Sequence, residues 1–318
     1  MSDNLLTARV HTIRYEAQGV LSIELRSPDG SPLPEYAPGS HIDLHLPNGL
    51  IRSYSLLSQY GKQAGYVVGV LRDRQSRGGS AWIHEQLRVG TLLPISAPRN
   101  NFALSEEPAH SVLVAGGIGI TPILCMLSNL VENARPAELI YCARNRLEAA
   151  FIEQIEQLNS HVTWHFDDEQ QTPPDLTQYL KDKPAGSHFY CCGPGAMLNA
   201  FEDTCQALGY DNVHIERFAA RPMAETQEVS QSYQVELKRS GKTLEVSAGQ
   251  SLLDALLASG CQVDCSCREG VCGSCETVVI DGMVDHRDSI LSKSEREANR
   301  SMMVCVSGCK SGKLVLDL

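Results

Sequence analysis

The spacing of four cysteines near the C-terminus constrains this chain more than any other feature. Cys267 is followed after four residues by Cys272 and after two more by Cys275, and Cys305 lies much further along. Plant-type 2Fe–2S clusters are bound with this spacing, because one tight loop supplies three thiolates and another segment supplies the fourth. The sequence therefore predicts a 2Fe–2S cluster held by these four residues.

The residues around the loop support this interpretation. Gly270 and Gly273 allow turns that a side chain would block. The alternative is a structural zinc site, but zinc prefers two CxxC pairs and the chain has one. Cys265 and Cys309 are surplus and are expected to be free thiols near the cluster. His286, among charged neighbours, is expected to lie in a solvated loop.

Composition sets the class of protein. The chain has 318 residues, 42% of them hydrophobic, which predicts two or three domains with proper cores. A net charge of −11 argues against a nucleic-acid partner. The N-terminus lacks the pattern of a secretory signal, and no apolar run approaches the roughly 20 residues that span a bilayer. We therefore expect a cytoplasmic protein without membrane contact, whose twelve cysteines serve metal chemistry rather than disulfides.

Sequence patterns divide the chain into a multidomain architecture. Short alternating strands between Pro and Gly turns predict an antiparallel β-barrel or sandwich over residues 1–105. Strands then alternate with helices over 106–222, which predicts an α/β domain with a parallel sheet. A polar linker is expected at 223–232, and an α+β domain at 233–318.

Individual helices follow from local signals. We expect one from about Ser80 to Leu87 with Ser80 as the N-cap, and one from Pro122 to about Leu130 with Thr121 as the N-cap. Further helices are expected at about 147–158, 194–208 and 252–258. Strands are expected at 112–115, 139–142, 162–166 and 188–192.

A run in the first domain indicates a flavin site. Arg52 and Tyr54 share one face of a strand, where arginine suits a phosphate and tyrosine suits stacking on a flat ring. Ser55 is placed to offer a hydrogen bond to the ring. Arg77-Gly78-Gly79-Ser80 opens a helix whose free N–H groups form a phosphate site. Each signal alone fits an edge-strand arginine or an ordinary helix start, but together they favour a flavin.

Two glycine turns in the second domain indicate a nucleotide site. Gly116 to Pro122 and Cys192 to Gly195 each follow a predicted strand, at the edge where α/β sheets bind ligands. Arg144 ends the second strand and is placed to reach an adenosine phosphate or ribose. A carboxylate such as Asp168 near the ribose favours NAD over NADP.

The sequence resembles the phthalate dioxygenase reductase family over essentially its whole length. The shared motifs are RSYSL at 52–56, RGGS at 77–80, GGIGITP at 116–122, CCGPGAM at 191–197 and CREGVCGSC at 267–275. The resemblance implies an FMN-binding barrel, an NADH-binding domain and a C-terminal plant-type ferredoxin domain of the β-grasp kind. The implied FMN contacts are Arg52, Ser53, Tyr54, Ser55, Val68, Gly69, Val70, Gly78, Gly79, Ser80, Thr121 and Phe218. The implied NADH contacts are Gly117, Gly119, Arg144, Asp168, Cys192, Gly193 and Pro194.

The resemblance also implies an activity. NADH would pass a hydride directly to FMN, and electrons would leave singly through the cluster to a Rieske-type oxygenase that acts on a small, often aromatic substrate. Direct transfer requires no catalytic acid or base, so none is assigned, with Cys192 and Ser55 the nearest candidates. We expect a monomer. The alternatives are an FAD-using reductase for a di-iron oxygenase and a non-enzymatic redox carrier or sensor.

Overall fold

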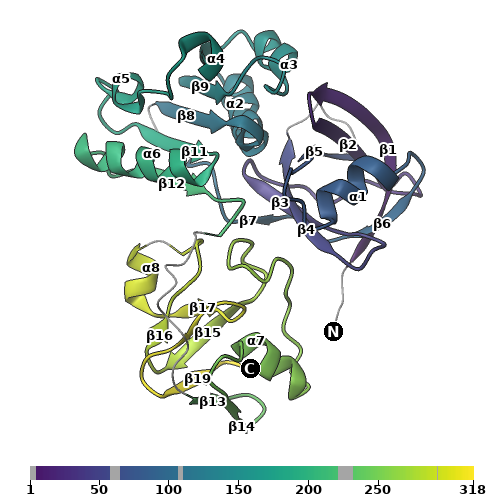
Figure 1. Ribbon diagram of the computed structural model, residues 1–318, viewed down its shortest axis with the longest axis vertical. Coiled ribbons are helices and arrows are strands. Elements are labelled where there is room, and N and C mark those ends of the chain that lie inside the picture. The colour runs from purple at the N-terminus through teal and green to yellow at the C-terminus, as the bar shows by residue number, and fades with distance from the viewer. Residues whose placement is uncertain (1–4, 58–64, 107–109, 221–231, 292) are drawn as a thin grey trace. The chain divides into compact units, whose positions relative to one another are not determined.

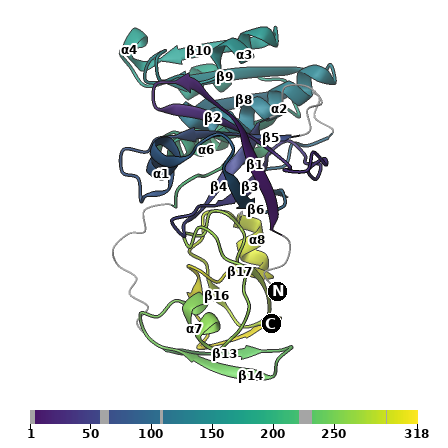
Figure 2. The same cartoon turned by 90° about the vertical axis from the view of Figure 1, so that its right-hand side faces the viewer.

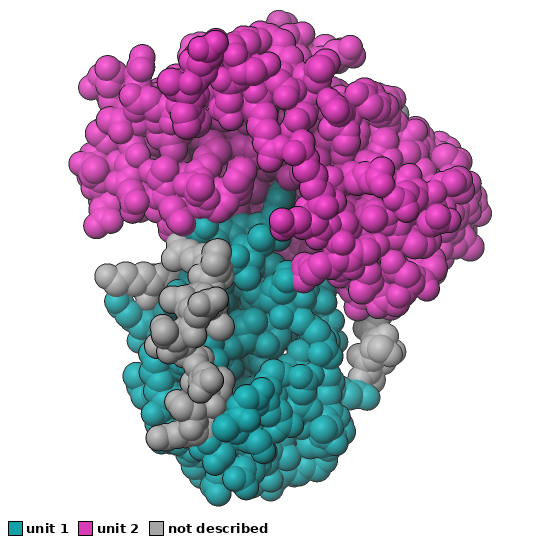
Figure 3. All heavy atoms as spheres, viewed as in Figure 1, with its two compact units in different colours: residues 1–3, 217–318 teal, residues 4–216 magenta. Residues whose placement is uncertain are grey.

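A computed structural model describes residues 5–57, 65–106, 110–220, 232–291 and 293–318. Among these residues, one compact unit lies within Asn4–Glu216 and another within Arg217–Leu318, coloured separately in Figure 3. Apart from Ser232, the expected linker at 223–232 lies outside the described residues.

The larger unit begins with an antiparallel β-barrel and one helix (Figure 1). Its strand order is β4-β5-β2-β1-β6-β3-β7, and β4 also pairs with β3, so the sheet closes on itself. Closure satisfies the backbone at both edges of β4, the strand that carries the predicted flavin residues. The elements are β1 (Leu6–Ala17), β2 (Val20–Arg26), β3 (Ser40–His45), β4 (Ile51–Leu57), β5 (Gly65–Leu71), α1 (Gly79–Gln86), β6 (Leu92–Ile95) and β7 (Arg99–Asn100).

The same unit continues into a parallel sheet with the order β10-β9-β8-β11-β12. The order reverses between β8 and β11, which makes the carboxyl ends of these two strands a switch point. The strands are β8 (Ser111–Gly116), β9 (Ala137–Ala143), β10 (His161–Phe166), β11 (His188–Cys192) and β12 (Val213–Glu216). The helices are η1 (Gly117–Gly119), α2 (Ile120–Glu132), α3 (Ile152–Gln157), α4 (Asp167–Gln170), α5 (Leu176–Leu180) and α6 (Gly195–Ala207).

Helix α2 joins the barrel to the parallel sheet. Its residues are buried nearly all the way round, because the sheet covers one side and barrel residues cover another (Figures 1 and 2). Leu127 is fully buried in this shared core, which also contains Val20 and Leu57 of the barrel. The two layers therefore share a single hydrophobic core.

The expected N-cap of α1, Ser80, is wrong by two residues. The helix begins at Gly79 rather than Ser80, with Gly78 in the left-handed region at φ +91° as the N-cap. Ser76 supplies the capping hydroxyl, because its Oγ accepts hydrogen bonds from the N–H groups of Gly78 and Ala81, each at 3.2 Å.

Two other helix starts also differ from expectation. Thr121 lies within the first turn of α2 and does not cap it, because η1 leads directly into the helix and Thr121 Oγ1 donates to the carbonyl of Ile118 at 3.1 Å. Helix α3 is shorter than predicted because Phe151 adopts a left-handed conformation at φ +64°, which a regular helix cannot contain.

The smaller unit packs helix α7 against a mixed sheet of order β14-β13-β19-β15-β17. Strand β13 pairs parallel with β19 and antiparallel with β14, as in a β-grasp arrangement. Ser251 caps α7 by accepting a hydrogen bond from the N–H of Asp254 at 3.1 Å. The elements are β13 (Tyr233–Leu237), β14 (Lys242–Val246), α7 (Leu252–Ala258), β15 (Glu276–Asp281), β16 (Val284–Asp285), α8 (Lys293–Ala298), β17 (Ser301–Met303), β18 (Gly308–Cys309) and β19 (Lys313–Leu316).

The shared core should dominate the stability of the larger unit. Leu127→Ala is expected to lower its free energy of unfolding by about 2–5 kcal/mol, the usual cost of such a cavity. Both tryptophans, Trp82 and Trp164, lie in this unit, so fluorescence during urea denaturation reports its unfolding alone. Leu147→Ala is the matched control, because Leu147 is 72% exposed. Equal midpoints for the two variants would contradict the shared core.

Candidate functional site

The four predicted cluster ligands come together in the smaller unit. The thiol of Cys267 interacts directly with those of Cys272 and Cys305, and that of Cys275 with Cys305. The backbone N–H of Glu269 donates to Cys267 Sγ at 3.3 Å. The neighbouring thiols hold the pKa of Cys267 well below its usual range, and donation to Cys267 raises the pKa of Cys272 and of Cys305. Contacting thiols with backbone hydrogen bonds to sulfur fit an iron–sulfur cluster.

The two surplus cysteines have other surroundings. Cys309 lies on β18, where it pairs with Val284. Cys265 and Cys309 are both half-buried against the core of the smaller unit.

Gly270 sets how closely the cysteine loop packs on the rest of its unit. Its φ is +67°, and a Cβ at this position would lie 2.6 Å from Val306 Cγ2 and 3.0 Å from Asp288 Cα. The N–H of Ser289 donates to the carbonyl of Gly270 at 2.9 Å. Any side chain at position 270 would push the loop away from these neighbours.

Cluster content should therefore depend on Gly270. Gly270→Ala adds a left-handed alanine and an overpacking cost of about 1–3 kcal/mol, so iron and acid-labile sulfide per chain should fall. Gly249→Ala is the control, because Gly249 has φ +81° but nothing within 4 Å of an added Cβ. Both variants carry the backbone strain, and only the first carries the clash. Equal sulfide contents would show that the loop tolerates a side chain.

Arg52 links strand β4 to the start of α1, the two segments that were predicted to bind a phosphate. Its Nη2 donates to the carbonyl of Arg77 at 3.4 Å, just before α1. A Cβ on Gly79 would lie 2.6 Å from Arg52 Nε, so position 79 must be glycine for the guanidinium to lie there. Ser80 follows within the first turn of the helix. A guanidinium beside a helix N-terminus suits a phosphate group.

The neighbours of Arg52 on β4 differ in what they offer a ligand. Ser53 Oγ donates to Asp43 Oδ1 at 2.5 Å, and Arg99 Nη2 donates to the other oxygen of Asp43 at 2.7 Å. The hydroxyl proton of Ser53 is therefore engaged within the barrel. Burial raises the pKa of Tyr54 to about 12, against the opposing effect of Arg52, so its ring stays neutral and suited to stacking.

Strand β5 comes close to Thr121, the predicted flavin residue of α2, at Gly69. Val68 and Val70 are fully buried in the barrel core, so only their backbones are available to a ligand. A Cβ on Gly69 would lie 2.6 Å from Thr121 Cγ2 and 3.2 Å from Phe151 Cζ. Gly69 and Thr121, far apart in sequence, are therefore neighbours.

The turns after β8 and β11 meet at the switch point. A Cβ on Gly119 would lie 2.1 Å from the carbonyl oxygen of Cys192, and one on Gly193 would lie 3.1 Å from Gly116 Cα. Glycine allows these two backbones to approach. The turns contain most of the predicted NADH residues: Gly117, Gly119, Cys192, Gly193 and Pro194.

Arg144 and Asp168 also lie together, at the edge of the sheet formed by β9 and β10. The N–H of Asp168, in α4, donates to the carbonyl of Arg144 at 3.0 Å. Arg146 is a further candidate that the sequence patterns do not single out. Its Cζ lies 4.5 Å from the ring centroid of Phe166, which fixes a second guanidinium near this edge.

Glu216 is another residue that the sequence patterns miss. It ends β12 opposite Cys192 in the sheet, and Ser55 Oγ donates to its Oε2 at 3.4 Å. Burial raises the pKa of Glu216 to about 8, while the hydrogen bond from Ser55 opposes the shift. Burial, followed by the charge of Glu216, raises the pKa of Cys192 well above its usual value. A proton-holding carboxyl thus lies beside a predicted flavin residue.

The protonation of Glu216 should appear in the pH profile of flavin reduction. Below about pH 8 the carboxyl is neutral, and above it a negative charge forms beside Ser55, a predicted flavin residue. Stopped-flow reduction by NADH should slow as pH rises through this value in the wild-type protein, whereas Glu216→Gln should show a flatter profile. The exposed Glu153→Gln serves as the control. If Glu216→Gln kept the wild-type profile, another group would be responsible.

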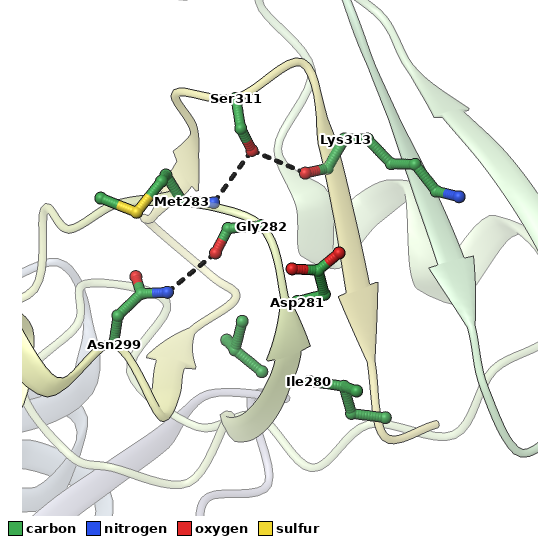
Figure 4. Close-up of a pocket in the computed structure, with 8 residues that line it drawn as sticks. Ile280, Asp281, Gly282, Met283, Asn299, Ser311 and Lys313 are labelled. Atoms are coloured by element: carbon green, nitrogen blue, oxygen red, sulfur yellow. Dashed lines mark hydrogen bonds between the residues drawn. The ribbon is translucent and has the colours of Figure 1, made fainter.

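The smaller unit also has an exposed aromatic side chain and a shallow hollow. Phe218 belongs to this unit and is 43% exposed. A shallow hollow is formed by Val279, Ile280, Asp281, Gly282, Met283, Asn299, Ser311 and Lys313 (Figure 4). Ser311 Oγ accepts from the N–H of Met283 at 2.9 Å and donates to the carbonyl of Lys313 at 2.7 Å, so it serves to shape the turn after β15.

Comparison with known proteins adds to these findings. The family described as 2Fe-2S iron-sulfur cluster binding domain matches residues 235–310, and the family described as Dimethylamine monooxygenase subunit DmmA-like, N-terminal domain, matches residues 96–215. The chain is 46% identical to a phenoxybenzoate dioxygenase subunit beta from Ectopseudomonas oleovorans, over 98% of this chain and 97% of that protein. In the described part of the chain, no helix has both the length and the apolar character needed to cross a membrane.

Two solved structures are similar to the whole chain. Phthalate dioxygenase reductase, described as a modular structure for electron transfer from pyridine nucleotides to [2Fe-2S], is 35% identical with a TM-score of 0.73, covering 99% of this chain and 98% of that one. An intact type IV self-sufficient cytochrome P450 monooxygenase is 37% identical with a TM-score of 0.90, and the match covers 99% of this chain but only 41% of that longer one.

Proposed function

This chain belongs to the phthalate dioxygenase reductase family, and we propose that it takes hydride from NADH onto FMN and delivers single electrons through its 2Fe–2S cluster to a Rieske-type oxygenase. The observation that carries the proposal is the combination, in one chain, of four contacting thiols, a guanidinium at a helix start and a nucleotide switch point. A one-electron carrier alone would need only the first of these.

The proposed flavin site has residues suited to binding the phosphate, the ring and a proton. A bound flavin takes electrons in pairs and releases them singly, which matches a two-electron donor to a one-electron cluster. Arg52 and the first turn of α1 would hold its phosphate, and Tyr54 would stack on its ring. Ser55 and Glu216 would hold a proton beside the ring, and direct hydride transfer requires no other acid or base.

We propose FMN rather than FAD, because the cradle at Arg52 and Gly79 suits a terminal phosphate monoester. The flavin site would lie in residues 1–105, the NADH site in 106–222 and the ferredoxin in 233–318. Asp168 beside Arg144 supports NADH over NADPH, because a carboxylate near the ribose repels a 2′-phosphate. The reaction would take place in the cytoplasm, where NADH is available.

The electron acceptor is proposed from the relatives. The similarity to a dioxygenase subunit supports an oxygenase that acts on a small aromatic substrate, which the reductase itself would not contact. The likeness to a self-sufficient P450 supports a second class of acceptor, a haem monooxygenase. Reduction of a purified acceptor of each class by the NADH-reduced protein would separate the two.

An anaerobic NADH titration tests the electron path. We expect the flavin and cluster absorption to bleach together and a rhombic S = 1/2 EPR signal to appear at low temperature. Cys272→Ser should lose that signal while the flavin still bleaches, because one iron ligand is gone. Cys265→Ser is the matched control and should behave like the wild-type protein. Flavin bleaching without any EPR signal in the wild-type protein would remove the last step of the proposal.

The same preparation separates the alternatives. Extracted flavin that proved to be FAD would favour a reductase for a di-iron oxygenase. No turnover of NADH with an artificial acceptor would favour a carrier or sensor.

A further inference from the structure

The segment after β16 buries charged groups that a solvated loop would expose. The side chain of Asp288 is 0% exposed and that of His286 is 9% exposed. The expectation of a solvated loop at His286 is therefore wrong. A carboxylate withdrawn from water is costly unless hydrogen bonds and an opposite charge compensate it.

Asp288 has both kinds of compensation. Its Oδ2 accepts hydrogen bonds from the N–H groups of Leu291 at 2.8 Å and Ile290 at 3.2 Å. Arg296 Nη2 lies 3.5 Å from the same oxygen and donates to the carbonyl of Asp288 at 2.7 Å. His286 Nδ1 lies 3.7 Å from Oδ1, too far for a hydrogen bond. The buried Asp288 carboxylate thus pairs with the partly exposed guanidinium of Arg296 and is held by backbone groups.

Asp288 lies against the cysteine loop. The Cα of Asp288 would be 3.0 Å from a Cβ on Gly270, and the next residue, Ser289, donates its N–H to the carbonyl of Gly270 at 2.9 Å. Gly270 lies between Cys267 and Cys272 in the loop. The backbone that carries the buried carboxylate therefore directly supports the segment that supplies three thiolates.

We propose that Asp288 and Arg296 are positioning residues for the cluster loop and that their charges shift the reduction potential of the cluster in opposite directions. The inference rests on the proposed function only in assuming that the four thiols hold a cluster. Charges act strongly where protein rather than water surrounds them, and the potential of such clusters depends on nearby charge and hydrogen bonding. The carboxylate disfavours an added electron, and the guanidinium favours it.

The test is a dye-mediated redox titration of the cluster in the holoprotein, with dithionite as the reductant and EPR as the readout. Asp288→Asn retains an oxygen that can cap Ile290 and Leu291, and should raise the potential. Arg296→Gln should lower it. Each change is expected to alter the one-electron equilibrium with the dye about tenfold, which is 59 mV. The double variant should return close to the wild-type potential.

Two controls separate charge from structure. Asp281→Asn removes an exposed carboxylate at the far end of β15 (Figure 4), and should leave the potential unchanged. Arg296→Lys keeps the positive charge and should stay near the wild-type potential. Shifts of Asp288→Asn and Arg296→Gln in the same direction, or no shift in either, would overturn the proposal.

Loss of fold in one variant leaves the test intact. If Asp288→Asn fails to retain its cluster, the contrast between Arg296→Gln and Arg296→Lys still decides, since equal potentials in these two would refute the role of charge. Because dithionite replaces NADH, a failure of NADH to reduce the protein would bear on the proposed function and not on this inference. A wild-type protein without a cluster would refute the proposed function itself.

Discussion

The hydrophobic core shared by the barrel and the parallel sheet is the constraint on which the larger unit depends. Helix α2 is apolar on nearly every side because it is covered by both layers. That shared burial holds β4 and β5 at a fixed distance from the carboxyl ends of β8, β11 and β12. Ser55 consequently meets Glu216, and Gly69 meets Thr121, although more than fifty residues separate each pair. The proposed flavin and nucleotide sites thus depend on the same packing arrangement.

The smaller unit uses a different device around its cysteines. Its core lies between α7 and the sheet, whereas the loop from Cys267 to Cys275 has little regular structure of its own. Support comes from the contact at Gly270 and from the adjacent Asp288, a buried carboxylate that pairs with Arg296.

The sequence patterns predicted the features that depend on residues close together in the chain. The cysteine spacing, the helix at 252–258 and the strands of the parallel sheet follow from short-range signals, and the structure has them. The start of α1 differed because the hydroxyl of Ser76, rather than that of Ser80, caps the helix. Residue spacing alone does not tell which of the two serines is the cap. Glu216 was missed because its partner lies 161 residues away. The burial of Asp288 was unexpected because charged residues are normally exposed, and the N–H groups and Arg296 that compensate its carboxylate appear only in the folded structure.

The burial and raised pKa of Cys192 affect how readily the protein is oxidised. A reduced flavin that meets oxygen is a source of peroxide, and thiolates are the form of cysteine that peroxide attacks. Cys192 is fully buried and its pKa is raised, so it persists as a thiol at the very edge where the two nucleotides would meet. Cys142 and Cys205 are likewise buried with raised pKa values of about 12. All five cysteines of the larger unit are buried, so oxidation of cysteine should begin among the partly exposed cysteines of the smaller unit.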